Sequence, residues 1–186
     1  MKKIIEGLPP IANQKPVVLI LGSMPSEESL RKQEYYGHPR NAFWKIMARL
    51  FEFDFDSPYS SRKRNLLTNN LAVWDVLQSC ERKGSLDSSI VDETITENDF
   101  AAFYQNHPDI TQVFFNGTKA ESEYYKRVIP ALTDKHKKIK TTRLPSTSPA
   151  MASLSFEKKL LQWSIVKKEL EQSLQNESIK YQVNNK

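Results

Sequence analysis

Four short apolar runs separated by helical patterns constrain the fold of this chain more than any other feature. The runs cover residues 17–21, 71–76, 112–116 and about 139–144. Between them, apolar residues recur at helical spacing, as in Phe43, Ile46, Met47 and Leu50. Short apolar runs that alternate with helices are typical of a parallel sheet covered on both faces. The sequence therefore predicts an α/β fold in which the last strand, which is rich in polar residues, is the most exposed.

Polar caps and prolines mark where the helices begin and end. The expected helix starts are Ser57-Pro58, residues 96–99, about Lys119 and about Ser155. Residues 78–95 lack a clear period, which predicts a functional loop after the second strand. From about Gln172 the chain turns polar. We therefore expect one domain over residues 1–172 and a frayed polar tail over residues 173–186.

Composition excludes several classes of protein. The chain has 186 residues, of which 39% are hydrophobic and 26% charged, as in an ordinary soluble domain. A single cysteine, Cys80, excludes an intramolecular disulfide and an iron–sulfur cluster held by several thiolates. The three histidines lie far apart and lack the spacing of zinc ligands. We expect neither a metal nor a cofactor.

Charge and targeting signals say less about function. The formal net charge of +5 is compatible with a polyanionic partner, but many proteins that bind no nucleic acid share it. The first six residues hold too short an apolar run for a signal peptide. No run approaches the ~20 apolar residues of a membrane span. A cytoplasmic protein without a membrane partner is expected, and a monomer is the simplest assumption.

The first strand leads into a turn and then into a cluster of polar, aromatic and basic residues. The turn is Gly22-Ser23-Met24-Pro25, and the cluster runs from Tyr35 to Trp44. Open α/β sheets bind ligands at the carboxyl ends of their strands. Stacking rings, an amide and cations at such a place suit a nucleobase on a phosphate backbone.

Several segments, in order, resemble the uracil-DNA glycosylase superfamily, and most closely its hypoxanthine-DNA (deoxyinosine) glycosylase branch. They are residues 21–26 with 35–44, 73–77, 84–87, 115–120 and 144–150. The resemblance covers roughly residues 16 to 170. It implies a three-layer α/β/α fold around a four-stranded parallel sheet. It also implies a repair enzyme that flips a deaminated base out of DNA, hydrolyses its N-glycosidic bond without a cofactor and leaves an abasic site.

The resemblance singles out Asn41 and Ser23 for catalysis. Asn41 holds the place of an asparagine linked to activity in the hypoxanthine branch, where an amide can orient water or steady the leaving base. It can equally cap the following helix. Ser23 stands where many relatives have Asp or Asn. A serine hydroxyl can orient water but needs an adjacent base to accept a proton, so it can also be a simple turn residue.

Four residues are candidates for base binding. Tyr36 holds the position at which relatives stack a ring on the flipped base, and Tyr35 can close the pocket or pack in the core. Asp75 stands where uracil-removing relatives place an asparagine. Its carboxylate can accept the N1–H of hypoxanthine, which adenine lacks, but it can also cap its strand or pair with Arg82. Asn116 can read O6 or bind the turn backbone.

The candidates for DNA binding lie mainly in the second motif of the superfamily. Hydroxyl and backbone groups of Ser146, Thr147 and Ser148 can hold phosphates. Met151 is placed to wedge into the vacated stack. The cationic or imidazole candidates for phosphate contact are Arg143, His38 and Arg40, although a solvated surface position is the ordinary reading of Arg40.

Other functions remain open on the sequence alone. A uracil or mismatch glycosylase of the same fold is one, although Ser23 and Asp75 argue against it. A catalytically silent nucleic-acid-binding domain explains Ser146, Met151 and the charge equally well. A flavodoxin-type nucleotide-binding domain is disfavoured, because the chain has five glycines and no Gly-x-Gly.

Overall fold

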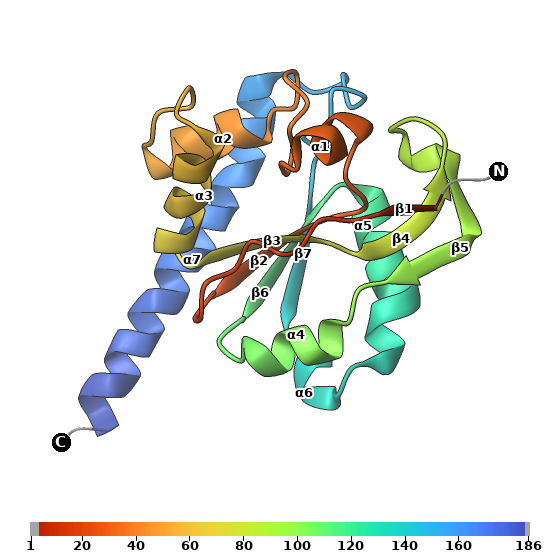
Figure 1. Ribbon diagram of the computed structural model, residues 1–186. Coiled ribbons are helices and arrows are strands. Elements are labelled where there is room, and N and C mark those ends of the chain that lie inside the picture. The colour runs from red at the N-terminus through yellow and green to blue at the C-terminus, as the bar shows by residue number, and fades with distance from the viewer. Residues whose placement is uncertain (1–3, 185–186) are drawn as a thin grey trace.

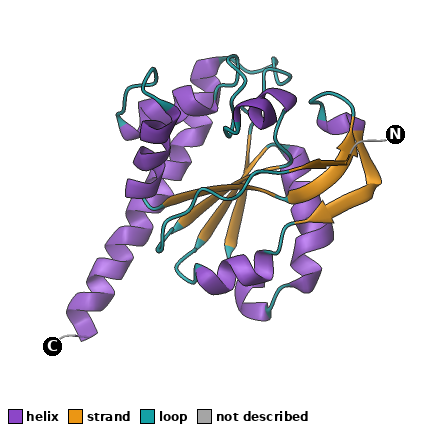
Figure 2. Cartoon of the chain, viewed as in Figure 1, coloured by secondary structure: helices purple, strands orange, loops and turns teal. Residues whose placement is uncertain are grey.

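The computed structural model describes residues 4–184 and contains a parallel sheet with helices on both faces (Figures 1 and 2). Its strands are β2 (Val18–Gly22), β3 (Leu71–Asp75), β6 (Gln112–Asn116) and β7 (Lys140–Leu144). Their spatial order is β3-β2-β6-β7, and each neighbouring pair is parallel. The predicted four-stranded parallel sheet is confirmed.

Burial follows the position of each strand in this sheet. Every residue of β2 and β3 is buried, because helices cover both faces and a continuous apolar run can be accommodated. In β7, Leu144 is buried while Lys140 and Arg143 are exposed. The predicted exposed strand is therefore the edge strand.

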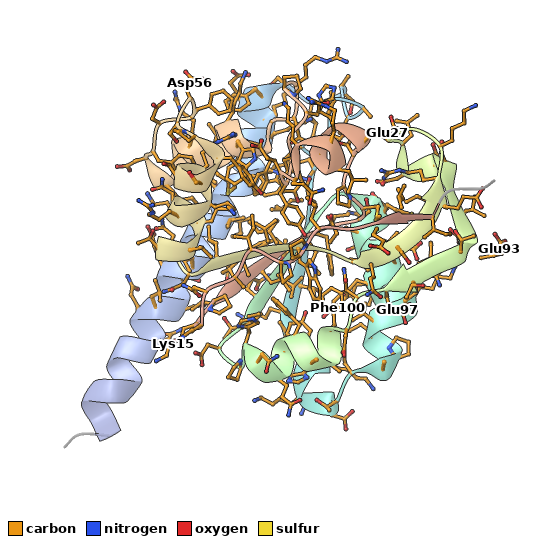
Figure 3. The ribbon with its side chains drawn as sticks, in the orientation of Figure 1. Lys15, Glu27, Asp56, Glu93, Glu97 and Phe100 are labelled. Carbon is orange, nitrogen blue, oxygen red and sulfur yellow. The ribbon has the colours of Figure 1, made fainter. Side chains whose placement is uncertain are left out.

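Two groups of helices form the outer layers (Figure 1). One layer contains α2 (Phe43–Phe51), α3 (Tyr59–Thr68) and α7 (Phe156–Asn184), and the other contains α4 (Phe100–Asn106), α5 (Thr118–Glu123) and α6 (Asp134–Lys137). The short helix α1 (Glu27–Lys32) follows the turn after β2. A π-helical turn (Tyr124–Val128) and a 3₁₀ turn (Ile129–Ala131) extend α5. Side chains fill the space between the layers (Figure 3). The ring of Phe100, for example, packs against Trp74 of β3 with the centroids 5.0 Å apart.

Helix boundaries lie close to those expected. Helix α3 begins at Tyr59, with Pro58 rather than Ser57 in the capping position. Asp99 caps α4 by accepting the backbone N–H of Ala102 at 2.9 Å. Helix α7 continues to Asn184, so the expected polar tail is helical over residues 173–184, and residues 185–186 lie outside the described part of the chain. None of the described helices is both long enough and apolar enough to cross a membrane.

Residues 78–95 do not form the expected loop. They lie largely in an antiparallel hairpin of β4 (Leu77–Arg82) and β5 (Ile90–Glu97), which β1 (Ile4–Glu6) extends in the order β1-β4-β5. The pairing of β4 with β5 shifts register twice, near Ser79 and again before Glu81. These irregularities break the period of two by which a strand is recognised in sequence.

The tip of this hairpin is fixed against the turn that follows β2. The buried guanidinium of Arg82 donates to the backbone oxygens of Pro25 and Gly84, the latter at 2.9 Å. The Ser85 hydroxyl accepts the backbone N–H of Glu27 at 2.9 Å. The hairpin therefore lies beside the carboxyl ends of the parallel strands, where ligands bind in open α/β sheets.

Candidate active site

A cavity of about 320 Å³ opens at the carboxyl ends of β2, β3 and β6. Its volume is in the range of small-molecule clefts. Ten sequence-predicted site residues line it: Ser23, Tyr35, Tyr36, Asn41, Asp75, Asn116, Ser146, Thr147, Ser148 and Met151. His38, Arg40 and Arg143 are not among the lining residues.

Asp75 is a buried carboxyl group in the wall of this cavity. It is 3% exposed, and its Oδ2 has no hydrogen-bond partner among the described residues. Gly22 is its register partner on β2, and a Cβ atom there would lie 2.2 Å from Asp75 Oδ1. Only glycine leaves room for the carboxyl group at this point. The alternative ion pair with Arg82 is not formed, since that guanidinium binds backbone oxygens instead.

The surroundings of Asp75 oppose its ionised form. Burial raises the pKa of Asp75 to about 7; the nearby charge of Asp87 also raises it, while Arg82 acts in the opposite direction. Near neutral pH the group is therefore present both as a carboxylate and as a carboxylic acid. The acid form offers a donor and an acceptor side by side.

Tyr36 presents an aromatic ring beside this carboxyl group. Its backbone has a left-handed φ of 54°, which is strained for a residue other than glycine. The ring stacks on Phe43 with the centroids 3.9 Å apart. Its hydroxyl is buried with no hydrogen-bond partner in the described part of the chain, and burial, followed by the charge of Asp75, raises the pKa of Tyr36. Because Phe43 covers one ring face, the other is the face available to a flat ligand.

Tyr35, the neighbouring residue, has a different role. It is 3% exposed, its hydroxyl donates to the Leu8 carbonyl at 2.9 Å, and its own carbonyl accepts the indole N–H of Trp44 at 2.7 Å. These bonds agree with the packing alternative. Tyr35 touches the cavity, but its polar atoms are used within the core.

Asn41 both supports a helix and lines the cavity. Its Oδ1 accepts the backbone N–H of Phe43 at 3.0 Å, at the start of α2. Support of the helix and a place at the cavity, the two alternatives for this residue, are therefore compatible. Since the oxygen is already engaged, the amide NH₂ is the group left for a ligand, and it has no partner within the part of the chain that is described.

Ser23 has an acidic neighbour that sequence reasoning missed. Its hydroxyl donates to Asp87 Oδ1 at 2.6 Å, and Asp87 also lines the cavity. Asp87 follows the hairpin tip and begins a 3₁₀ turn (Asp87–Ser89). The only sequence signal for Asp87 was that residues 84–87 resemble the family. Its contact with Ser23 could not be read from the sequence, because the two positions are 64 residues apart.

Asn116 positions the loop at residues 145–151, which contains most of the second motif. Its amide nitrogen donates to Thr147 Oγ1 and its amide oxygen accepts the Thr147 backbone N–H, both at 2.8 Å. This pairing agrees with the alternative in which Asn116 binds the backbone. Gly117 has a φ of 100°, and a Cβ there would lie 3.0 Å from Ser146 Cβ. The oxygens of Ser146 and Ser148 each accept a nearby backbone N–H, which leaves both hydroxyl hydrogens to donate.

Two exposed apolar side chains flank the cavity. Met151 is 38% exposed and Leu86, on the hairpin, is 56% exposed. The buried Lys159 of α7 donates to the Met151 carbonyl at 2.8 Å and so fixes the loop that carries it. Leu86 was not expected from the sequence.

The remaining basic candidates lie outside the cavity. Arg143 is paired with Glu121 at 2.8 Å on the exposed edge strand. His38 Nδ1 accepts the backbone N–H of Arg40 at 3.1 Å. Among the described residues, no group of three or more His, Cys, Asp or Glu side chains is arranged to hold a metal ion.

The raised pKa of Asp75 predicts a specific dependence of stability on pH. Between about pH 4 and pH 7 the folded protein keeps a proton that the unfolded chain loses, so the free energy of unfolding falls as the pH rises. A shift of this size corresponds to roughly 4 kcal/mol. Asp75→Asn should lack this fall and be more stable than the wild type at pH 8, with the difference closing towards pH 4. Urea unfolding across this range tests it, and parallel curves for the two proteins would contradict the burial argument.

Comparison with known proteins identifies the family of this chain. The family model of the uracil DNA glycosylase superfamily matches residues 9–169. A protein named hypoxanthine DNA glycosylase from Methanosarcina acetivorans is 40% identical over 63% of this chain and 73% of its own length. A second protein of that name, from Methanosarcina barkeri, is 39% identical over 64% of this chain and 74% of its own length. A solution NMR structure of a candidate uracil DNA glycosylase from M. acetivorans matches with a TM-score of 0.75 and 35% identity, over 91% of this chain and 99% of that one. This chain belongs to the uracil DNA glycosylase superfamily.

Proposed function

We propose that this protein is a monofunctional DNA glycosylase that removes deaminated bases from DNA, hypoxanthine before uracil, and leaves an abasic site. The observation that carries the proposal is the meeting of Tyr36, Asp75 and Asn41 in one cavity at the carboxyl ends of the strands. A ring face, a buried carboxyl group and a free amide are what a flipped base requires. The relatives named hypoxanthine DNA glycosylase support this choice of base.

Recognition of the base rests on Tyr36 and Asp75. The free face of Tyr36 stacks on the base, an interaction worth roughly 1–3 kcal/mol. The unpartnered Oδ2 of Asp75 is free for the edge of the base. Hypoxanthine presents an N1–H donor beside the O6 acceptor, so the carboxylate accepts N1–H, and the acid form also donates to O6. Adenine lacks the N1 hydrogen and is refused by the carboxylate.

Asn41 stabilises the departing base. Rupture of the bond between C1′ and the base nitrogen leaves negative charge on the base, and a fixed N–H donor beside that charge lowers the barrier. The Asn41 oxygen is held by Phe43, so its NH₂ is fixed in orientation. This arrangement suits a reaction that is driven mainly by departure of the base.

The loop at residues 145–151 grips the DNA. Ser146 and Ser148 donate their hydroxyl hydrogens to phosphates, and Thr147 holds the loop to Asn116. Met151 from this loop and Leu86 from the hairpin enter the stack on either side of the extruded nucleotide.

A substrate panel tests the proposal. The purified protein is incubated, with EDTA present, with duplexes that contain one inosine, uracil, xanthine or normal base, and abasic sites are then cleaved with alkali. Cleavage at inosine above uracil is the expected result. Uracil as the better substrate would favour a uracil-type enzyme, and DNA binding without cleavage at any base would leave only a silent binding domain.

Replacement of Asn41 separates chemistry from binding. Asn41→Ala should lower the single-turnover rate on inosine by roughly 10²–10³-fold, the usual loss for one fixed donor to a developing anion. DNA affinity should stay nearly unchanged, because Asn41 is not a phosphate ligand in the proposal. Gel-shift and single-turnover measurements on one duplex decide this, with circular dichroism to confirm that α2 is intact. Unchanged turnover would remove Asn41 from the mechanism.

Replacement of Asp75 tests how the base edge is read. Asp75→Asn keeps the shape but fixes one donor and one acceptor, as at this strand end in uracil-removing relatives. The ratio of the inosine rate to the uracil rate should fall by about tenfold, which corresponds to one hydrogen bond. The two rates are measured under single-turnover conditions at pH 7 and pH 8.5. A ratio equal to that of the wild type would rule out edge reading by Asp75.

A further inference from the structure

Two carboxyl groups with opposite surroundings lie at the same cavity. Asp75 is buried at the end of β3, whereas Asp87 is exposed on the hairpin and bonded to Ser23. When environment separates two such groups in this way, one is suited to act as an acid or neutral donor and the other as a base.

We propose that Asp87, which holds the Ser23 hydroxyl, accepts the proton of the water that attacks C1′. This assignment rests on the proposed glycosylase function and names the residue that activates water within it. A serine in this turn cannot accept a proton without a base beside it. The 2.6 Å bond from Ser23 Oγ to Asp87 Oδ1 supplies that base from another part of the chain.

The other polar groups of the site are less suited to this task. Asn41 is an amide, not a base, and its oxygen is occupied by the Phe43 N–H. Asp75 is buried and kept partly protonated by its surroundings. Asn116 uses both amide atoms on Thr147. Asp87 is the remaining cavity-lining residue with a carboxylate, within the described part of the chain.

The hydrogen bond to Ser23 fixes the direction of proton transfer. The serine hydrogen is directed at Asp87, so the serine oxygen can accept a hydrogen bond from water. As the water oxygen bonds to C1′, the bond from C1′ to the base breaks and its electron pair leaves with the base. The water proton passes to Asp87, directly or through Ser23. The base regains a proton either from solvent or from the acid form of Asp75, which then takes a proton back from solvent. Asp87 returns its proton to water.

The hairpin holds Asp87 in place through contacts on three sides. Arg82 binds Pro25 and Gly84, Ser85 binds the start of α1, and the Ser23 carbonyl accepts the Leu77 N–H at 3.1 Å. A base needs such fixed geometry, because proton transfer requires hydrogen-bonding distance to the reacting water. The hairpin thus has a catalytic purpose besides its contact with DNA.

Two titratable groups interact with the charge of Asp87: Asp75 on β3 and Cys80 on β4. Arg82, also on β4, acts on both of them in the opposite direction. Their charges enter any pH profile of the reaction. The Asp75 contribution is removed by measuring the profile in an Asp75→Asn background as well.

The test compares single-turnover rates on an inosine duplex from pH 5 to pH 8.5. The variants are Asp87→Asn, Ser23→Ala, their double variant, and Glu93→Gln as the charge control, since Glu93 lies on the outer side of the same hairpin (Figure 3). Asp87→Asn should be about 10²-fold slower or more across this pH range, as for loss of a general base. The double variant should be no slower than Asp87→Asn, because the two residues act as a unit. Glu93→Gln should match the wild type.

A second measurement keeps the proposal testable if a variant is perturbed. Asp87→Ala leaves space at an exposed position, so added formate should restore part of the lost rate if the carboxylate is a proton acceptor. A merely structural role predicts no rescue. An Asp87→Asn rate like that of the wild type, or Asp87→Ala that formate does not rescue, would overturn the proposal.

The same experiment distinguishes this inference from the proposed function. If the wild type cleaves inosine and Asp87→Asn does so equally well, the glycosylase function stands and only the role of Asp87 fails. If the wild type releases no base from any duplex, both fail together.

Discussion

The parallel pairing of β2 with β3 is the interaction on which the site depends. Its register sets Gly22 opposite Asp75 at the carboxyl ends of the two strands. Past that point, Val76 N–H donates to the Gly22 carbonyl at 2.9 Å and Leu77 N–H to the Ser23 carbonyl at 3.1 Å. The turn after β2 is therefore bonded to the start of β4. A change of register by one residue would move the carboxyl group, the serine and the hairpin out of reach of one another.

A second set of bonds fixes the opposite side of the cavity. Thr147 is 1% exposed, is bonded twice to Asn116, and accepts the backbone N–H of Ala42 through its carbonyl at 2.9 Å. It joins the end of β6, the loop proposed to grip DNA and the start of the helix preceded by Asn41. Buried polar groups that are fully bonded in this way make a unique arrangement, because breaking any one leaves an unsatisfied partner. The position of Asn41 therefore depends on β6, the loop that carries Thr147 and the start of α2 together.

The parts of this structure that sequence could predict are those encoded locally. Buried parallel strands appear as continuous apolar runs, so β2, β3 and β6 were identified with nearly correct ends. The β4–β5 hairpin was not, because two register shifts and the buried Arg82 hide its alternation. Nor does local sequence explain why Tyr35 is bonded within the core while Tyr36 presents a ring face to the cavity. The left-handed backbone at Tyr36 separates them, and tertiary packing determines it.

The position of Asp87 has a consequence for how such an enzyme can vary. The groups proposed to read the base, Tyr36 and Asp75, stand in or beside the parallel sheet, whereas the proposed base of the reaction stands on the antiparallel hairpin. Substitution on the sheet changes which base is held, and substitution on the hairpin changes how water is activated. The two are coupled through the charge of Asp87, which opposes ionisation of Asp75. Loss of that charge should lower the pKa of Asp75, so a change in chemistry on the hairpin also alters base selection on the sheet.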